Sequence, residues 1–328
     1  MDERNLEKAK KELIELVNQT DADIVGMPNR HKRGMEQVLT HLPYYLDIYT
    51  RCMTELHDTE DCLFVDFGGG HGLLGTFAKL LGFQKVIYVD FNADALRVAQ
   101  ELKNNLGVGA DEFLCGDMDT LKEWLEQHPY KTKILIATDV IEHIYNLESF
   151  FSTAASLNFK SMVFTTASNP ENPLLVWKLR RYMQADETGN RENPNFLKLR
   201  RNYIMEQFPE LTDDEAEYWA EHTRGLVYAD IDKAVSNRKI FTDIDPYNTC
   251  DPRTGSWTER ILPLSEYQSI LEKNGLTMNV RNGFYNTFSG GVKGMTARIL
   301  NRLIEKSADK NHFLAPFIFF DITCKNSD

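Results

Sequence analysis

Cysteine, long apolar runs and positive charge are all scarce in this sequence. The five cysteines form no CxxC pair, so we expect reduced thiols and no disulfide framework. The longest apolar run, Phe313–Phe320, is about eight residues long and contains Pro316, whereas a membrane-spanning helix needs roughly 20. The charged N-terminus has no signal-peptide core. These absences predict a cytoplasmic protein without a membrane partner.

Basic residues number 37 against 49 acidic residues, so the net charge over 328 residues is −12. Binding to nucleic-acid phosphates needs a basic face, and we therefore expect no DNA partner. Hydrophobic residues make up 42% and charged residues 26%. These values are close to globular norms, which excludes a disordered or collagen-like chain.

Short apolar runs alternate with helical patterns after a helical segment over residues 1–57. The apolar runs lie at 62–67, 86–89, 112–115, 134–138 and 162–166. The alternation resumes near residue 262, with helical patterns at 264–273 and 296–306 and strand patterns at 277–285 and 317–324. Strands that alternate with helices predict a doubly wound α/β fold around a mostly parallel sheet.

The stretch between the two α/β parts, residues 168–261, is polar, and its pattern predicts mainly helices. One of these helices begins with a capping box at Thr212–Glu215. We therefore predict one sheet domain that carries an insertion. Its parts are an N-terminal helical cap (1–57), a first core part (58–167), the insertion (168–261) and a second core part (262–328). We expect the insertion and the cap to close over a site on the core.

A glycine-rich turn follows the first predicted strand. Asp66-Phe-Gly68-Gly-Gly70-His-Gly72 leads from that strand into a helix. Glycines permit positive φ values and close approach of a ligand, and a helix N-terminus favours an anionic group. Gly70–Gly75 also fits GxGxxG, and Asp90 lies 20 residues later. An NAD(P)-dependent oxidoreductase is therefore one interpretation.

The next three predicted strands also end in polar groups, which are Asp90-Phe91, Asp117-Met118 and Asp139–His143. Open α/β sheets bind ligands at the carboxyl ends of their strands. There Asp66 can face an ammonium group, and Asp90 can accept both hydroxyls of a ribose. Phe91 can cover an adenine face, and Asp117 can accept from the adenine amino group.

This arrangement resembles the class I S-adenosylmethionine-dependent methyltransferases, over about residues 60–167 and 262–325. The later segments Leu262–Gly275 and Asn282–Asn286 look like those of small-molecule members. The resemblance implies a seven-stranded sheet whose last strand is antiparallel, with S-adenosylmethionine as the cofactor. It implies a cofactor site formed by Asp66, Gly68, Gly70, Gly72, Asp90, Phe91, Asp117, Met118 and Asp139. We expect methyl transfer to a small or medium-sized metabolite, most simply to oxygen or nitrogen.

His143 and Asp139 are the candidates for catalysis. Histidine suits the removal of a proton from a hydroxyl or ammonium acceptor. Its structural alternative is a hydrogen bond to a loop carbonyl, and Asp139 could instead cap the following helix. Asp139, Glu142 and His143 are also similar to the acidic-acidic-His cluster of metal-assisted methyltransferases. No second histidine follows His143, so we expect no metal.

The insertion supplies His222, Arg224 and Tyr228 as candidates for substrate binding. Its four arginines at 180, 181, 200 and 201 could form an anion-binding face, or they could lie on solvated helix surfaces. If the arginines form an anion-binding face, an RNA methyltransferase of the same fold is the alternative function. Independently of these arginines, a non-catalytic interaction protein is a further alternative. We expect the N-terminal amphipathic helix to be exposed, where it could pair two copies in a homodimer.

Overall fold

The computed structural model describes residues 3–19, 29–54, 61–190 and 194–325, so the expected boundary at 57/58 lies outside the described residues. One sheet has the strand order β3-β2-β1-β4-β5-β7-β6. Its strands are β1 (Cys62–Phe67), β2 (Lys85–Asp90), β3 (Glu112–Cys115), β4 (Thr132–Thr138), β5 (Ser161–Thr166), β6 (Leu276–Asn282) and β7 (Ile318–Cys324).

The first five strands are parallel, and β7 runs antiparallel between β5 and β6. The predicted doubly wound sheet with an antiparallel last strand is confirmed. The usual dinucleotide-binding order is 3-2-1-4-5-6. The inserted antiparallel β7 departs from it, which weakens the oxidoreductase interpretation.

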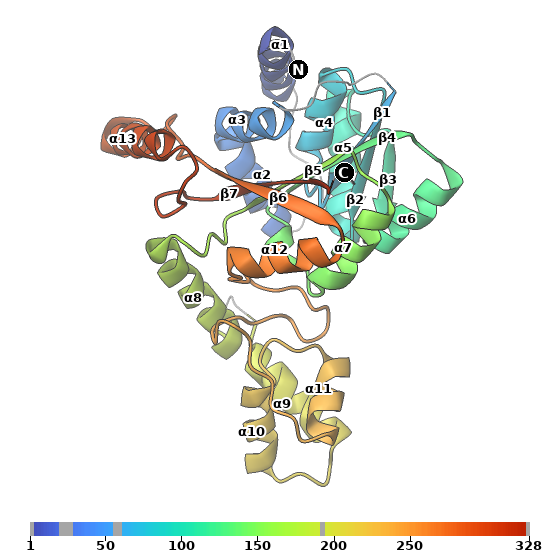
Figure 1. Cartoon of the computed structure of the whole chain (residues 1–328), viewed down its shortest axis with the longest axis vertical. Coiled ribbons are helices and arrows are strands. Elements are labelled where there is room, and N and C mark those ends of the chain that lie inside the picture. Colours follow the sequence, from blue (N-terminus) through green and yellow to red (C-terminus); the bar gives the residue numbers. More distant parts are fainter. Residues whose placement is uncertain (1–2, 20–28, 55–60, 191–193, 326–328) are drawn as a thin grey trace.

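Helices cover both faces of this sheet (Figure 1). They include α4 (Leu73–Leu80), α5 (Ala93–Leu106), α6 (Met118–Gln127), α7 (Leu147–Ser156) and α12 (Leu264–Lys273). Side chains alternate across β1, so that Phe64 joins the core under α4 and α5 whereas Leu63 and Val65 join the core under α6, α7 and α12. Six of the six β1 residues are buried, as expected for a central parallel strand.

The N-terminal cap consists of α1 (Glu3–Gln19), α2 (Asn29–Thr40) and α3 (Leu42–Met53). Leu6, Ala9 and Leu13 of α1 are buried, and α1 packs on α3 and α4. The apolar face that we expected to be exposed for a homodimer is therefore buried within the chain, because it completes the core. Pro43 lies in the first turn of α3, where its fixed φ favours a helix start.

The insertion forms an arm, residues 168–261, with α8 (Pro173–Thr188), α9 (Phe196–Gln207), α10 (Asp213–His222) and α11 (Tyr228–Ser236). Figure 1 shows α9 to α11 beyond α12, away from the sheet. The predicted capping box is confirmed, since the Thr212 side chain accepts from the Glu215 amide and Glu215 accepts from the Thr212 amide.

The connection between β6 and β7 holds α13 (Gly291–Ser307). Strand β6 ends at Asn282, earlier than the predicted Tyr285, and the Gly283 N–H still donates to the Phe317 carbonyl at 2.9 Å. Among the described helices, none is both long and apolar enough to cross a membrane.

Candidate functional site

The glycine turn packs directly on the loop after β4. Gly68, Gly70 and Gly72 have φ values of 65°, 52° and 78°, which glycine adopts without strain. A Cβ atom on Gly68 would lie 2.4 Å from Cγ2 of Val140, whereas one on Gly70 would meet no atom within 4 Å. The turn is therefore closed towards the β4 loop and open above Gly70, where a ligand can approach its backbone.

Asp90 ties this turn to the end of β2. Its Oδ2 accepts the Gly70 N–H at 3.1 Å, and its Oδ1 accepts the Asn92 N–H at 2.9 Å. The Tyr88 hydroxyl donates to the Gly70 carbonyl at 2.8 Å. Phe91 follows immediately and is 67% exposed. The end of β2 thus combines a fixed carboxylate with an uncovered aromatic ring.

Asp66 lies behind the turn. It is buried, and its Oδ2 accepts the Gly75 N–H at 2.8 Å. Burial raises the pKa of Asp66 to about 7, the negative charge of Asp90 adds to the increase, and the hydrogen bond from Gly75 opposes it. Asp66 therefore changes its charge near neutral pH.

Asp117 caps α6. Its Oδ1 accepts the N–H groups of Asp119 and Thr120, both at 3.1 Å, and Met118 is buried at the helix start. Both bonds use the same oxygen. The carboxylate therefore has a structural role next to the place where we expected adenine.

Asp139 has a left-handed backbone conformation, with φ of 62°. Its N–H donates to the Thr165 carbonyl at 3.0 Å, and the residue is exposed. The alternative that Asp139 caps the following helix is wrong, because Asn146 caps α7. A strained non-glycine residue at a strand end is typical of functional sites.

His143 ends a short 3₁₀ helix, Ile141–His143. Its Nδ1 lies 2.7 Å from the Trp257 carbonyl oxygen. A carbonyl only accepts, so Nδ1 carries the proton and neutral His143 presents the Nε2 lone pair. The predicted structural alternative, a bond to a loop carbonyl, is confirmed. The same bond orients the ring so that Nε2 can act as a base.

The end of the arm pairs with this short helix. The Trp257 N–H donates to the His143 carbonyl, and the Arg260 N–H donates to the Glu142 carbonyl, both at 3.2 Å. These bonds hold Glu259, whose Oε2 accepts the Ser168 hydroxyl at 3.0 Å. The charges of Asp139 and His143 both act on Glu259, so the pairing brings an acidic side chain from the arm to the end of β4.

Two of the carboxyl groups near His143 resist ionisation. Burial raises the pKa of Glu142 well above its ordinary value, and the charges of Asp139 and Glu259 add to the increase. The pKa of Glu259 is raised by burial and then by Asp139. Oε1 of Glu142 accepts the Ala167 N–H at 3.1 Å, while Oε2 has no hydrogen-bond partner among the residues that the structure describes. Sequence reasoning missed Glu259, because no local motif marks it.

The cap contacts the same edge of the sheet. The His71 ring packs against Gly34 of α2, with Cε1 3.2 Å from where a Cβ would stand. Burial raises the pKa of Tyr45, and the charge of Asp139 adds to this increase, so α3 lies within electrostatic reach of Asp139. The cap therefore packs against the glycine turn, and α3 lies within electrostatic reach of the β4 loop.

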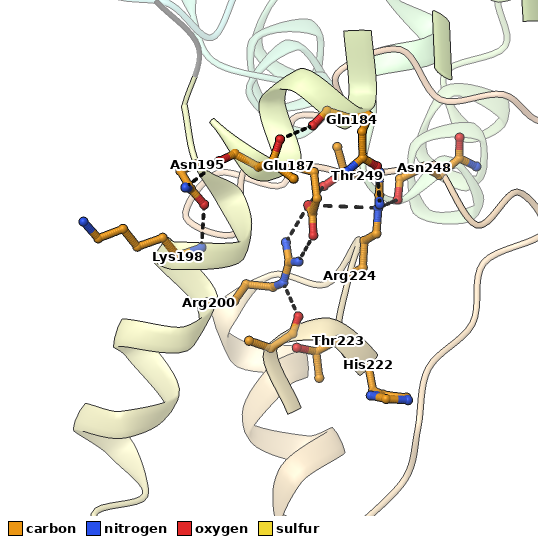
Figure 2. Close-up of polar contacts among 12 residues, drawn as sticks. Gln184, Glu187, Asn195, Lys198, Arg200, His222, Thr223, Arg224, Asn248 and Thr249 are labelled. Carbon is orange, nitrogen blue, oxygen red and sulfur yellow. Dashed lines mark hydrogen bonds and ion pairs between the residues drawn. The ribbon is translucent and has the colours of Figure 1, made fainter. Parts of the chain in front are cut away.

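The predicted substrate residues lie elsewhere, inside the arm. Arg224 donates to the carbonyls of Tyr247 at 2.6 Å and Asn248 at 3.2 Å, as Figure 2 shows in part. His222 stacks on Tyr218, and Tyr228 stacks on Tyr203 with 3.8 Å between ring centroids. Their hydrogen bonds and ring contacts lie within the arm, although α11 begins beside Val227, whose N–H donates to the hydroxyl of Tyr145 in the loop after β4 at 3.3 Å.

Three of the four arginines in the arm are paired with carboxylates. Arg200 is fully buried and donates to Glu187 and to the Ala220 carbonyl (Figure 2). Arg180 pairs with Asp245 and Arg201 with Glu217, both at 2.8 Å. An anion-binding face made of all four is therefore not formed. Arg200 is also not on a solvated surface, because it belongs to the core of the arm.

No three His, Cys, Asp or Glu side chains are arranged to hold a metal ion in the part of the chain that the structure describes. The Asp139, Glu142 and His143 cluster does not form such a group, since Glu142 is turned towards the Ala167 amide.

A family model described as a methyltransferase domain matches residues 58–268. No curated protein matches the chain. Among solved structures, a putative S-adenosylmethionine dependent methyltransferase from Listeria monocytogenes is 14% identical, covering 85% of this chain and 98% of that one, with a TM-score of 0.44. An S-adenosylmethionine dependent methyltransferase from Mesorhizobium loti is 13% identical, covering 83% of this chain and 95% of that one, with a TM-score of 0.39. PKMT2 from Rickettsia typhi is 15% identical, covering 85% of this chain and 53% of that one, with a TM-score of 0.45. The family match covers more than half of the chain, and it carries the assignment.

Proposed function

Because this chain belongs to the methyltransferase domain family and is a class I S-adenosylmethionine-dependent methyltransferase, we propose that it methylates oxygen or nitrogen of a small or medium-sized metabolite, with His143 as the base. The observation that carries the proposal is the bond between His143 Nδ1 and the Trp257 carbonyl at 2.7 Å. It directs the basic nitrogen of a neutral imidazole away from the loop.

The residues around the glycine turn fit S-adenosylmethionine. The open space above Gly70 admits a ligand to the backbone, and the Asp90 carboxylate and the exposed Phe91 ring suit a ribose and an adenine. We propose that Gly68, Gly70 and Gly72 hold the methionine part, with Asp66 near its ammonium group. Asp117, Met118 and Asp139 would complete this site.

The bound cofactor supplies a methyl group that its sulfonium already activates, so the chain mainly has to position the acceptor and remove its proton. His143 can accept that proton at Nε2 while the Trp257 carbonyl stabilises the protonated ring through Nδ1. The cap, which packs against the turn at Gly34 and comes within electrostatic reach of Asp139 at Tyr45, would help to exclude water.

The carboxyl groups at the end of β4 support an acceptor that carries a proton on oxygen or nitrogen. The raised pKa values of Glu142 and Glu259 show that this environment already disfavours negative charge, so it suits a neutral or cationic acceptor better than an anionic one. We propose that Glu259 contacts the acceptor, whereas a contact with His222, Arg224 or Tyr228 requires the acceptor to extend along the arm.

We further propose that the protein does not act on DNA and that it is cytoplasmic. The net charge of −12 supports the first part. The five cysteines, all free, support the second.

Calorimetry with S-adenosylhomocysteine tests the cofactor site. We expect binding, and we expect Asp90→Ala to weaken it at least tenfold, because the variant removes the acceptor that fixes Gly70. Asp94→Ala is the matched control, since Asp94 is an exposed acid on the same segment. Equal affinities of the two variants would contradict the proposed site.

A further inference from the structure

Helix α13 exposes a stripe of large apolar side chains. Val292, Met295, Ile299 and Leu303 are 74%, 55%, 51% and 47% exposed. Spacings of three and four residues place them on one face of the helix. The other face is used, since Gly294, Ala297 and Ile304 are buried. The stripe therefore lies on the opposite side of α13 from its buried residues.

The same helix is basic within an acidic protein. Lys293, Arg298, Arg302 and Lys306 are exposed against the single acid Glu305, which gives α13 a net charge of +3 in a chain of net charge −12. None of the four basic side chains forms an ion pair with a residue that the structure describes. At 3.6 residues per turn, Arg302 and Lys306 lie beside the apolar stripe.

This charge argues against a second copy of the chain as the occupant of the stripe. A two-fold axis would place the same patch of both copies face to face, and the basic side chains would then repel each other. The complementary occupant carries negative charge and accepts apolar side chains. The helix lies at the periphery of the molecule (Figure 1), so a broad surface can reach its exposed face more readily than a narrow groove can.

We propose that α13 docks on a lipid bilayer that contains anionic lipids. A helix with an apolar stripe flanked by Lys and Arg lies in the plane of the interface, with its apolar side among the upper acyl chains. Basic side chains beside it are attracted to anionic headgroups. Exposed Phe288, just before the helix, extends the apolar surface. The absence of a spanning run in the sequence does not bear on this mode of binding, because a surface helix needs none.

Docking through α13 brings the candidate site to the lipid surface. Strand β6 is parallel to β5, because both run antiparallel to β7, so β6 ends at the sheet edge where β1 and β4 carry the glycine turn and His143. Helix α13 leaves the sheet from that edge. An acceptor held at the bilayer surface would therefore lie on the side of the molecule that carries this site.

Sedimentation of the full-length protein with vesicles tests the proposal. We expect binding to vesicles of phosphatidylcholine mixed with phosphatidylglycerol, and little binding to phosphatidylcholine alone. Met295→Asp combined with Ile299→Asp should lower the affinity for these vesicles roughly tenfold or more. The reason is that two apolar side chains that would be buried among the acyl chains are replaced by charged ones. The control is Met205→Asp combined with Ile244→Asp, which changes the same residue types at exposed positions of the arm. This control variant should bind the vesicles as tightly as the unchanged protein does.

Arg298→Gln combined with Arg302→Gln should reduce the preference for the anionic vesicles. Thermal melting and S-adenosylhomocysteine binding show whether each variant is folded, and neither depends on lipid. The proposal is overturned if the protein ignores anionic vesicles, binds neutral vesicles equally well, or keeps its affinity after the change at Met295 and Ile299. Light scattering that shows a dimer dissociated by that same change, without vesicle binding, would assign the stripe to a second copy instead.

Discussion

Asp66, Asp117 and His143 each commit one side-chain atom to the fold. Oδ2 of Asp66 and Oδ1 of Asp117 accept backbone N–H groups, and Nδ1 of His143 donates to a carbonyl. The other carboxylate oxygens, Oδ1 of Asp66 and Oδ2 of Asp117, form no hydrogen bond with the residues that the structure describes. The same is true of Nε2 of His143. A structural bond and a ligand contact are therefore compatible in these residues, and the first orients the side chain for the second.

His143→Gln should lower kcat by about 10²- to 10⁴-fold, which is the usual contribution of a general base. The affinity for S-adenosylhomocysteine should not change, because the residue lies after β4 and not in the glycine turn. Steady-state kinetics and calorimetry measure the two effects. His128→Gln is the control, since His128 also bonds a backbone carbonyl through Nδ1 but is exposed at the C-cap of α6. A kcat within about threefold of the unchanged enzyme would exclude His143 as the base.

Asp66→Asn should flatten the pH dependence of both stability and cofactor affinity. The folded pKa of about 7 lies above the ordinary value of 3.8, so the folded state holds the extra proton between these values. The stability that this group contributes is therefore lost as pH rises from about 4 to about 7. If Asp66 faces an ammonium group, S-adenosylhomocysteine should bind more tightly as pH rises through 7. Thermal melts and calorimetry from pH 5.5 to 8 test both slopes, and unchanged slopes in Asp66→Asn would assign them to other groups.

Arg200 and Glu187 form a buried ion pair that links elements of the arm. Arg200 of α9 reaches Glu187 of α8 and the Ala220 carbonyl of α10, and Thr249 donates to the same carboxylate at 2.7 Å. Removal of one partner of a buried pair leaves an uncompensated charge, whereas its replacement by apolar residues is often tolerated. The pair therefore decides how three helices meet, even though it does not touch the candidate site.

Arg200→Ala should lower the free energy of unfolding by about 3–5 kcal/mol, because Glu187 stays buried without its partner. Arg200→Met combined with Glu187→Leu should recover most of this loss. Arg201→Ala is the control, since its ion pair with Glu217 is partly exposed and should cost no more than about 1 kcal/mol. Denaturant unfolding measures all three. Equal losses of unfolding free energy in Arg200→Ala and Arg201→Ala would show that the buried ion pair stabilises the fold no more than the partly exposed one does.

The charge of the whole molecule is unevenly distributed. The net charge is −12, yet α13 alone carries +3, and three of the four arginines in the arm face carboxylates. Phosphate binding requires unpaired basic groups along a groove. The distribution therefore favours a short contact at α13 and disfavours an extended nucleic-acid path along the arm.

Mixed-sequence single-stranded RNA should not bind at low salt, about 50 mM. Fluorescence anisotropy with a labelled oligonucleotide measures this. Affinity that falls linearly with the logarithm of salt concentration, and that is lost on Arg180→Gln combined with Arg201→Gln, would contradict this expectation. That result would favour the RNA methyltransferase alternative.

The amino-acid sequence alone predicts the sheet, the glycine turn and the polar strand ends. These features depend on short-range patterns, and the shared edge of parallel strands brings Asp66, Asp90 and Asp139 together without further information. Only the tertiary structure decided that Glu259 joins His143 and that the apolar stripe of α1 is buried. The same structure leaves the stripe of α13 exposed, although both stripes look alike in sequence. The physical reason is that burial depends on which distant segment covers a face, and local periodicity carries no information about that partner.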